Sequence, residues 1–166
     1  MIILGVDPGL NVSGYGIILL DRSRIHFVAA GAISTSKAGS FPEKLAILHR
    51  TCTEIIDDHK PDVFAIEETF SNINPRTSLK LGHARGVLIL AAEERDCPVF
   101  EYPATIVKKA LTGVGSASKE QVRYMVMKML KIQELTGSMD VTDALAVAIT
   151  HYHQIRFNIL KTGRQV

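Results

Sequence analysis

The chain has 166 residues, of which 46% are hydrophobic and 22% charged, with 12 Gly, 6 Pro and 2 Cys. These proportions exclude a collagen, a coiled coil or a disordered chain, and the length fits one domain. No apolar run approaches the roughly 20 residues that a membrane span needs, and the first residues do not resemble a secretory signal. Two cysteines make no disulfide framework, which favours buried thiols in a reducing compartment. We therefore expect a cytoplasmic protein with no membrane partner.

The net charge of +2 comes from 19 basic and 17 acidic residues, and it hides an uneven distribution. Residues 100–131 hold six basic side chains against two acidic ones, and residues 154–166 hold three basic side chains and no acid. A third basic group, around Arg76, Lys80 and Arg85, has no acidic neighbour in the sequence. A solvated helix face explains any one group. Three groups in a nearly neutral protein favour a polyanionic partner.

Apolar runs that end at turn residues predict strands at 1–7, 13–20 and 25–33. A helix is predicted at 41–59, where apolar residues recur at helical spacing and Pro42 suits the first turn. The same criteria predict, in chain order, a strand at 62–66, a helix at 78–95, a strand at 97–100 and helices at 104–111, 118–131 and 139–153. This order indicates a single α/β domain over residues 1–156. We expect residues 157–166 to form a flexible C-terminal tail.

Acidic residues stand where these elements end or begin. Asp7 ends the first predicted strand, and Glu67 directly follows strand 62–66. Connection rules favour parallel pairing of these two strands, which brings both carboxylates to the same sheet edge. Asp140 and Asp143 are three residues apart at the start of the last helix and so share a face. The rest of that helix is apolar almost all round, so it packs on the sheet and directs its acidic end toward the strands.

Each acid also has an ordinary explanation. Asp7 alone could serve the Asp-Pro-Gly turn, and Asp140 with Asp143 could complement the helix dipole. Glu67 is harder to explain, because a carboxylate that closes an apolar run is costly unless it has a partner. Four converging carboxylates favour a divalent cation, and hard oxygen ligands favour Mg²⁺ or Mn²⁺ over zinc. Two such cations catalyse phosphodiester hydrolysis, which together with the basic segments points to a nuclease.

Five motifs then occur in a recognisable order over residues 1–153. They are GVDPG with SGYG (5–9 and 13–16), AIE (65–67), SLKLGHARG (78–86), GVGSA with Lys119 (113–119) and DVTDALA (140–146). With them the chain resembles the RuvC-type Holliday-junction resolvases, members of the ribonuclease H-like superfamily. The resemblance implies an α/β, ribonuclease H-like fold with a mixed five-stranded sheet flanked by helices. The first three strands would be antiparallel, and the fourth and fifth parallel to the first.

The resemblance also implies roles for single residues. The metal-binding catalytic carboxylates would be Asp7, Glu67, Asp140 and Asp143, holding two Mg²⁺ per subunit, with Mn²⁺ as a substitute. Lys119 would assist the transition state electrostatically. The DNA-binding residues would be Phe70, Arg76, Lys80, Lys108, Lys109 and Lys119. Either Lys108 or its neighbour Lys109 would face the phosphate near the cut, and Phe70 would stack near the junction crossover or simply anchor its loop.

The implied activity is magnesium-dependent endonucleolytic resolution of four-way DNA junctions in recombination and repair. A homodimer with helix 78–95 at its interface would place paired nicks symmetrically and leave 5′-phosphate ends. A branch-migration helicase complex of the RuvA and RuvB type is the expected partner. His83 stands where Gln is expected and Ser13 where Thr is usual, and some family members carry His at the Asp140 position. None of these departures removes a metal ligand.

Three other functions compete with this interpretation. A non-catalytic module that recognises branched DNA would not need all four carboxylates. An ATP-binding fold of the actin or sugar-kinase type shares the first motif but needs two such domains and a much longer chain. A nuclease for RNA–DNA hybrids has the same fold and the same acids, so the choice of substrate is the least secure step.

Overall fold

A mixed five-stranded sheet forms the centre of the computed structural model, which describes residues 1–166 except 23, 69–73, 135–138 and 163–166. The strands are β1 (Ile2–Asp7), β2 (Val12–Asp21), β3 (Arg24–Ser34), β4 (Val63–Glu68) and β5 (Val99–Pro103), in the spatial order β3-β2-β1-β4-β5. β1, β2 and β3 pair antiparallel, whereas β4 and β5 run parallel to β1. The sheet predicted from the family resemblance is therefore confirmed.

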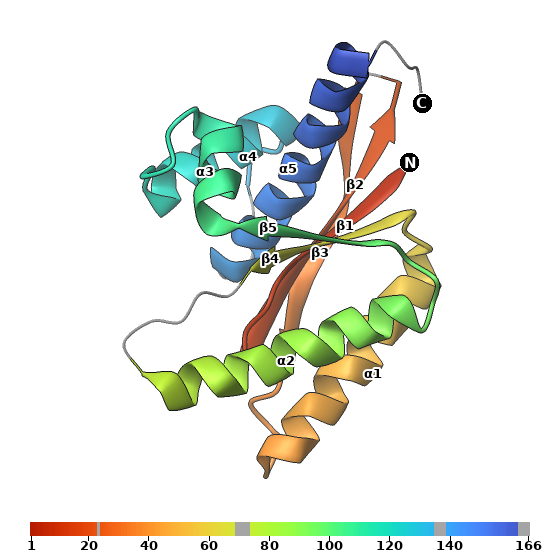
Figure 1. The fold of residues 1–166 in the computed structure, drawn as a ribbon, viewed down its shortest axis with the longest axis vertical. Helices are drawn as coiled ribbons and strands as arrows, with labels where there is room; N and C mark the ends of the chain where they lie inside the picture. Colours follow the sequence, from red (N-terminus) through yellow and green to blue (C-terminus); the bar gives the residue numbers. More distant parts are fainter. Residues whose placement is uncertain (23, 69–73, 135–138, 163–166) are drawn as a thin grey trace.

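Helices cover both faces of the sheet (Figure 1). One face carries α1 (Phe41–His59) and α2 (Pro75–Glu93), and the other carries α3 (Ala104–Thr112), α4 (Lys119–Leu130) and α5 (Met139–Thr162). Residues of β1 alternate between the two cores, as a strand buried on both faces requires. Ile3 joins the core beneath α5, while Leu4 and Val6 join the core beneath α1 and α2.

Local capping explains where two helices begin. α1 has the predicted bounds because Ser40 caps it, accepting a hydrogen bond from the Glu43 amide, and a proline stands in the first turn. α2 begins three residues earlier than predicted. The Asn74 side chain accepts hydrogen bonds from the amides of Arg76 and Thr77, and Pro75 follows the cap directly. The prediction for α2 follows apolar periodicity and overlooks this Asn-Pro cap.

Two other boundaries differ from the prediction. β5 begins at Val99 and continues to Pro103, because its register with β4 runs from Phe64 to Glu68. α5 continues to Thr162, so the helix end predicted at residue 153 is wrong. Beyond that point Arg156 donates a hydrogen bond to the Tyr152 hydroxyl, a contact one helical turn apart that supports the extension. The predicted boundary at residue 156 therefore lies inside a helix, and residues 163–166 of the predicted tail lie outside the described residues.

The two cysteines, Cys52 and Cys97, are buried and free, as predicted. In the part of the chain that the structure describes, no helix combines the length and the hydropathy that crossing a bilayer requires.

Candidate active site

Two of the predicted carboxylates lie side by side at one edge of the sheet. Asp7 is the last residue of β1, and Glu67 lies near the end of β4, whose Ile66 pairs with Val6. Because the two strands are parallel, their carboxyl ends meet, as the sequence predicted. Burial, followed by the negative charges of Glu67, Asp143 and Asp140 in that order, raises the pKa of Asp7 to about 8. Burial followed by the charge of Asp143 raises the pKa of Glu67 to about 7.

The other two carboxylates reach this edge because the N-terminus of α5 lies directly against the sheet. Gly14 of β2 pairs with Asp7, and a side chain there would overlap the carbonyl oxygen of Asp140. Gly5 makes a similar approach one turn further along, where a Cβ would overlap the backbone of Ala144 and Ala148. Only glycine permits such close approach of a helix to a strand. These two glycines therefore bring Asp140 and Asp143 toward Asp7.

A lysine from a second helix, α4, reaches the carboxylate cluster. Ser118 caps α4 with a complete capping box, which places Lys119 at its first position. The Nζ of Lys119 donates a hydrogen bond of 2.8 Å to Oδ2 of Asp143. This bond first, and then the charges of Asp143, Asp7 and Asp140, hold the pKa of Lys119 above its ordinary value, although burial works against it. The lysine therefore offsets part of the negative charge of the cluster.

Two adjacent lysines of α3 have different surroundings. The positive charge of Lys108 opposes the rise in the pKa of Glu67 that burial causes. The ammonium group of Lys108 therefore lies within electrostatic range of the carboxylate cluster. Lys109 lines a hollow between α3 and α5 instead. The sequence left open which of the two faces the site, and the structure places Lys108 on the side of the carboxylates.

The remaining predicted DNA-binding residues lie outside the carboxylate cluster. Lys80 of α2 stands over the Phe41 ring, with its Nζ 5.7 Å from the ring centroid, and Arg76 is exposed in the first turn of α2. Phe70 falls in 69–73 and so lies outside the described residues. Both basic residues belong to the first two turns of α2.

The donor chemistry of the cluster fits a divalent cation, although the coordination is not preformed. Within the described residues, no three acidic, histidine or cysteine side chains already surround a single point closely enough to coordinate an ion. The raised pKa values of Asp7 and Glu67 show that their charges are poorly compensated by the protein. A bound divalent cation would offset the repulsion between these neighbouring carboxylates, and a set of oxygen donors alone suits Mg²⁺ or Mn²⁺.

Sequence reasoning missed several residues that hold this edge in place. Ser13 is fully buried, and its hydroxyl donates to the Gly9 carbonyl and accepts from the Gly9 amide, which fixes the turn after Asp7. The buried Thr35 hydroxyl donates to the Leu10 carbonyl in the same turn. The motif Gly14-Tyr15-Gly16 was the available sequence signal for close packing of a helix on β2. The helix that packs there, α5, begins more than a hundred residues later, so the motif could not identify it. No local pattern marked Thr35.

This sheet, with acids at the ends of two parallel strands and at the start of a helix laid across them, defines a ribonuclease H-like nuclease fold. The yeast mitochondrial Holliday junction resolvase, with a TM-score of 0.67 at 16% identity over 98% of this chain and 84% of the other, shares the fold.

The family model "Crossover junction endodeoxyribonuclease RuvC" matches residues 3–151. The chain is 48% identical over 158 residues to the protein of that name from Actinobacillus succinogenes, covering 95% of this chain and 82% of the relative. Identity to the Pelotomaculum thermopropionicum protein is 47%, covering 92% and 93% of the two chains.

Thermus thermophilus RuvC in complex with its Holliday junction substrate superimposes with a TM-score of 0.89 at 31% identity, covering 95% of this chain and 96% of the other. The chain belongs to the RuvC family of crossover junction endodeoxyribonucleases, and it is a hydrolase that cleaves DNA junctions in recombination.

Proposed function

We propose that this endonuclease resolves four-way DNA junctions by paired symmetric nicks, each made by metal-assisted hydrolysis at the carboxylate cluster. The observation that carries the proposal is the convergence of Asp7, Glu67, Asp140 and Asp143 from three separate elements onto one sheet edge. The four carboxylates would hold two Mg²⁺ ions, with Mn²⁺ as a substitute. When bound, such a pair activates a water and stabilises the leaving oxygen of an in-line displacement.

The protein's own groups position and stabilise the substrate phosphate. The carboxylate of Asp143 accepts a hydrogen bond from the ammonium group of Lys119, which partly offsets its negative charge. The ammonium group of Lys119 lies at the cluster, where it would stabilise the charge that develops on the phosphate in the transition state. Lys108, on the same side of the cluster, binds a neighbouring phosphate and fixes the strand. The product carries a 5′-phosphate.

A comparison of three substrates tests this activity. We expect Mg²⁺-dependent cleavage of a four-way junction to exceed that of a linear duplex of the same sequence, or of an RNA–DNA hybrid, by at least roughly a hundredfold, or about 3 kcal/mol of discrimination. The readout is the single-turnover cleavage rate of each end-labelled substrate, with Ca²⁺ replacing Mg²⁺ as a control for binding alone. Equal rates on the three substrates would contradict junction specificity. Faster cleavage of the hybrid would favour the hybrid-nuclease alternative.

We also propose a homodimer that pairs two such sites through α2. The exposed face of α2 carries Leu79 and Leu90, which are 65% and 49% exposed. Between them stand Gly82 and Gly86, where an added Cβ would meet no atom within 4 Å. Large apolar residues that flank small ones suit close packing of two helices. A two-fold dimer gives each of two opposed DNA strands its own active site. We further propose that the protein is cytoplasmic and that it works with a branch-migration helicase complex of the RuvA and RuvB type.

The double substitution Gly82→Gln/Gly86→Gln tests the dimer. The new side chains enter open space, so the fold should tolerate them and gain roughly 1 kcal/mol or more of helix propensity. Across a dimer interface the same side chains prevent close approach, and we expect a monomer that nicks one strand without the paired second cut. Sedimentation equilibrium and a supercoiled cruciform assay provide the readouts. Ala46→Gln, at an exposed position of α1, is the matched control. An unchanged dimer would exclude this face.

A further inference from the structure

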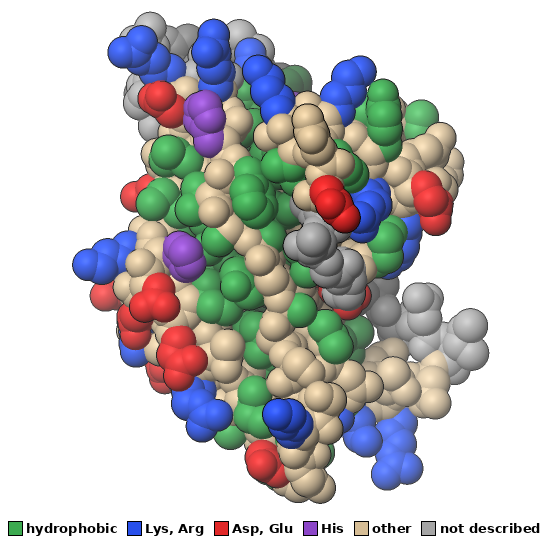
Figure 2. All heavy atoms as spheres, turned by 180° about the vertical axis from the view of Figure 1, so that it is seen from behind, with side chains coloured by type: hydrophobic (Ala, Val, Ile, Leu, Met, Phe, Trp, Pro, Cys, Tyr) green, Lys and Arg blue, Asp and Glu red, His purple; other side chains and the backbone are tan. Residues whose placement is uncertain are grey.

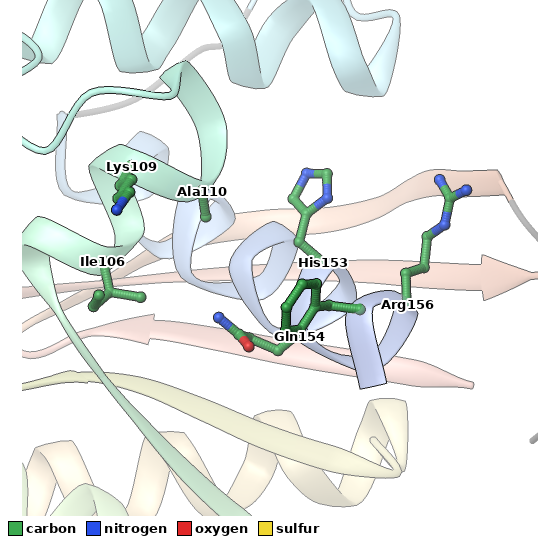
Figure 3. A pocket seen from close by; sticks show the side chains of 7 residues that line it. Ile106, Lys109, Ala110, His153, Gln154 and Arg156 are labelled. Atoms are coloured by element: carbon green, nitrogen blue, oxygen red, sulfur yellow. The ribbon is translucent and has the colours of Figure 1, made fainter. Parts of the chain in front are cut away.

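Two hollows flank the C-terminal half of α5, away from the carboxylate cluster. The first, of about 660 Å³, lies between α3 and α5, and Figure 3 shows Ile106 and Lys109 of α3 on one side and His153, Gln154 and Arg156 of α5 on the other. The second, of about 750 Å³, lies on the other side of the same turn of α5, against the start of β3 and the end of α4. The site described above uses neither hollow.

Both hollows are basic. Lys109 and Arg156 line the first, and Arg24, Lys131 and Arg156 line the second. Among the described residues, no acidic side chain lines either hollow, and none forms an ion pair with these four cations. Figure 2 shows mainly Lys and Arg side chains along the upper end of the molecule, where α5 ends in Figure 1, with acidic charge also present there, and more Asp and Glu side chains on the left flank. Positive charge therefore predominates around the two hollows, with Asp21 standing opposite Arg24 across the β2–β3 hairpin.

The guanidinium group shared by the two hollows is held in a defined position. Nη1 of Arg156 donates a hydrogen bond of 3.0 Å to the Tyr152 hydroxyl, and its guanidinium lies 5.7 Å from the centroid of that ring. A guanidinium fixed in this way loses little freedom when it binds an anion, and its remaining donors match the oxygens of a phosphate.

α3 connects this basic end to the active site. Lys108 acts on Glu67, whereas its neighbour Lys109 lines the first hollow. Along α5, Arg156 follows Asp140 by sixteen residues, which is about 24 Å of helix. The same distance along a DNA duplex is about seven base pairs. A junction arm that leaves the cleavage site along α3 and α5 is long enough to reach both hollows.

We propose that the two hollows beside the C-terminal half of α5 bind the phosphate backbone of one junction arm, about seven base pairs from the scissile phosphate. This inference rests on the proposed function and extends its DNA-binding surface to Arg24, Lys131 and Arg156. The cations that line both hollows, together with Lys108 and Lys119 at the carboxylate cluster, favour duplex DNA over an acidic peptide as the occupant.

The variant Arg24→Gln/Arg156→Gln tests the proposal on two four-way junctions, with Ca²⁺ to allow binding without cleavage. One junction has hairpin-closed arms of about five base pairs and the other has arms of about twenty, so that only the longer arms reach the hollows. For the long arms we expect roughly tenfold weaker binding, with the slope of log K against log salt reduced by about 2. For the short arms we expect equal affinity of the variant and the unchanged protein.

Three controls make the result decisive. Arg24→Lys/Arg156→Lys keeps the charge and should keep the preference for long arms. Arg50→Gln/Lys60→Asn removes two cations, from the middle and from the C-cap of α1, and should not alter that preference. Loss of affinity for both arm lengths, or for neither, would overturn the proposal, and the latter result would leave an acidic peptide as the occupant. Cleavage by the unchanged protein with Mg²⁺, measured on the same junctions, reports separately on the proposed function.

Discussion

Replacing Asp7 by Asn should lower the junction cleavage rate at least roughly a thousandfold, which is about 4 kcal/mol of transition-state stabilisation. Asp7 lies at the centre of the cluster, since the charges of Glu67, Asp140 and Asp143 all act on it. An amide is nearly the same size but lacks the charge that a divalent cation requires. We expect junction binding in Ca²⁺ to persist, because the variant removes a negative charge that faces DNA. Single-turnover cleavage and a gel-shift titration measure the two effects.

The same variant should stabilise the metal-free protein at high pH. The folded state raises the pKa of Asp7 from 3.8 to about 8, so it holds a proton that the unfolded chain releases above about pH 4. The free energy of unfolding therefore falls as pH rises from about 4 to about 8. The amide of the variant has no such proton to lose. At about pH 8.5 without metal, we expect the variant to be more stable by about 2 kcal/mol, or roughly 4–8 °C in Tm.

The pH course and a matched control separate this effect from general stabilisation. The difference in Tm between variant and unchanged protein should grow from about pH 4 to about pH 8 and then level off. Mg²⁺ at about pH 8.5 should raise the Tm of the unchanged protein by several degrees more than that of the variant, because the ligand stabilises only the state that binds it. Asp58→Asn, at an exposed position of α1, should show neither effect. Wild-type cleavage by Asp7→Asn would exclude the carboxylate cluster as the active site.

Replacing Gly14 by Ala should cost activity far more than it costs stability. The added methyl group overlaps the carbonyl oxygen of Asp140, so the first turn of α5 must move away from β2. A displacement of about 1 Å at a catalytic group lowers the rate roughly a hundredfold. The helix N-terminus can shift without opening the core, so we expect a loss of about 1–3 kcal/mol in stability. Single-turnover cleavage and thermal unfolding give the two values.

Two further glycines make this prediction specific. Gly5→Ala places its methyl group against the backbone of Ala144 and Ala148, in the middle of α5, where the helix cannot move away. We expect a loss of more than about 3 kcal/mol there, with activity lost through unfolding. At Gly39 a Cβ would meet only the Glu43 carboxylate at 3.5 Å, so Gly39→Ala should leave both properties unchanged. Full activity of Gly14→Ala would show that the close approach does not position Asp140.

Several features could be predicted from sequence because their causes lie within a few residues. Pro42 and the apolar spacing after it defined α1, and the apolar runs that end at Asp7 and Glu67 placed both acids at strand ends. The motif order indicated the sheet topology through family resemblance. The start of α2 was predicted less well, although a local signal, the Asn74 cap, is present there.

The sequence by itself thus determined the elements, the carboxylates and the presence of basic segments behind a net charge of +2. Only the tertiary structure decided which distant groups meet: Lys119 with Asp143, Gly14 with Asp140, and Lys108 rather than Lys109 with Glu67. It also placed Arg24 and Arg156 at the same hollow. Periodicity and turn chemistry act between near neighbours along the chain, whereas these contacts depend on how strands and helices pack across large separations in sequence.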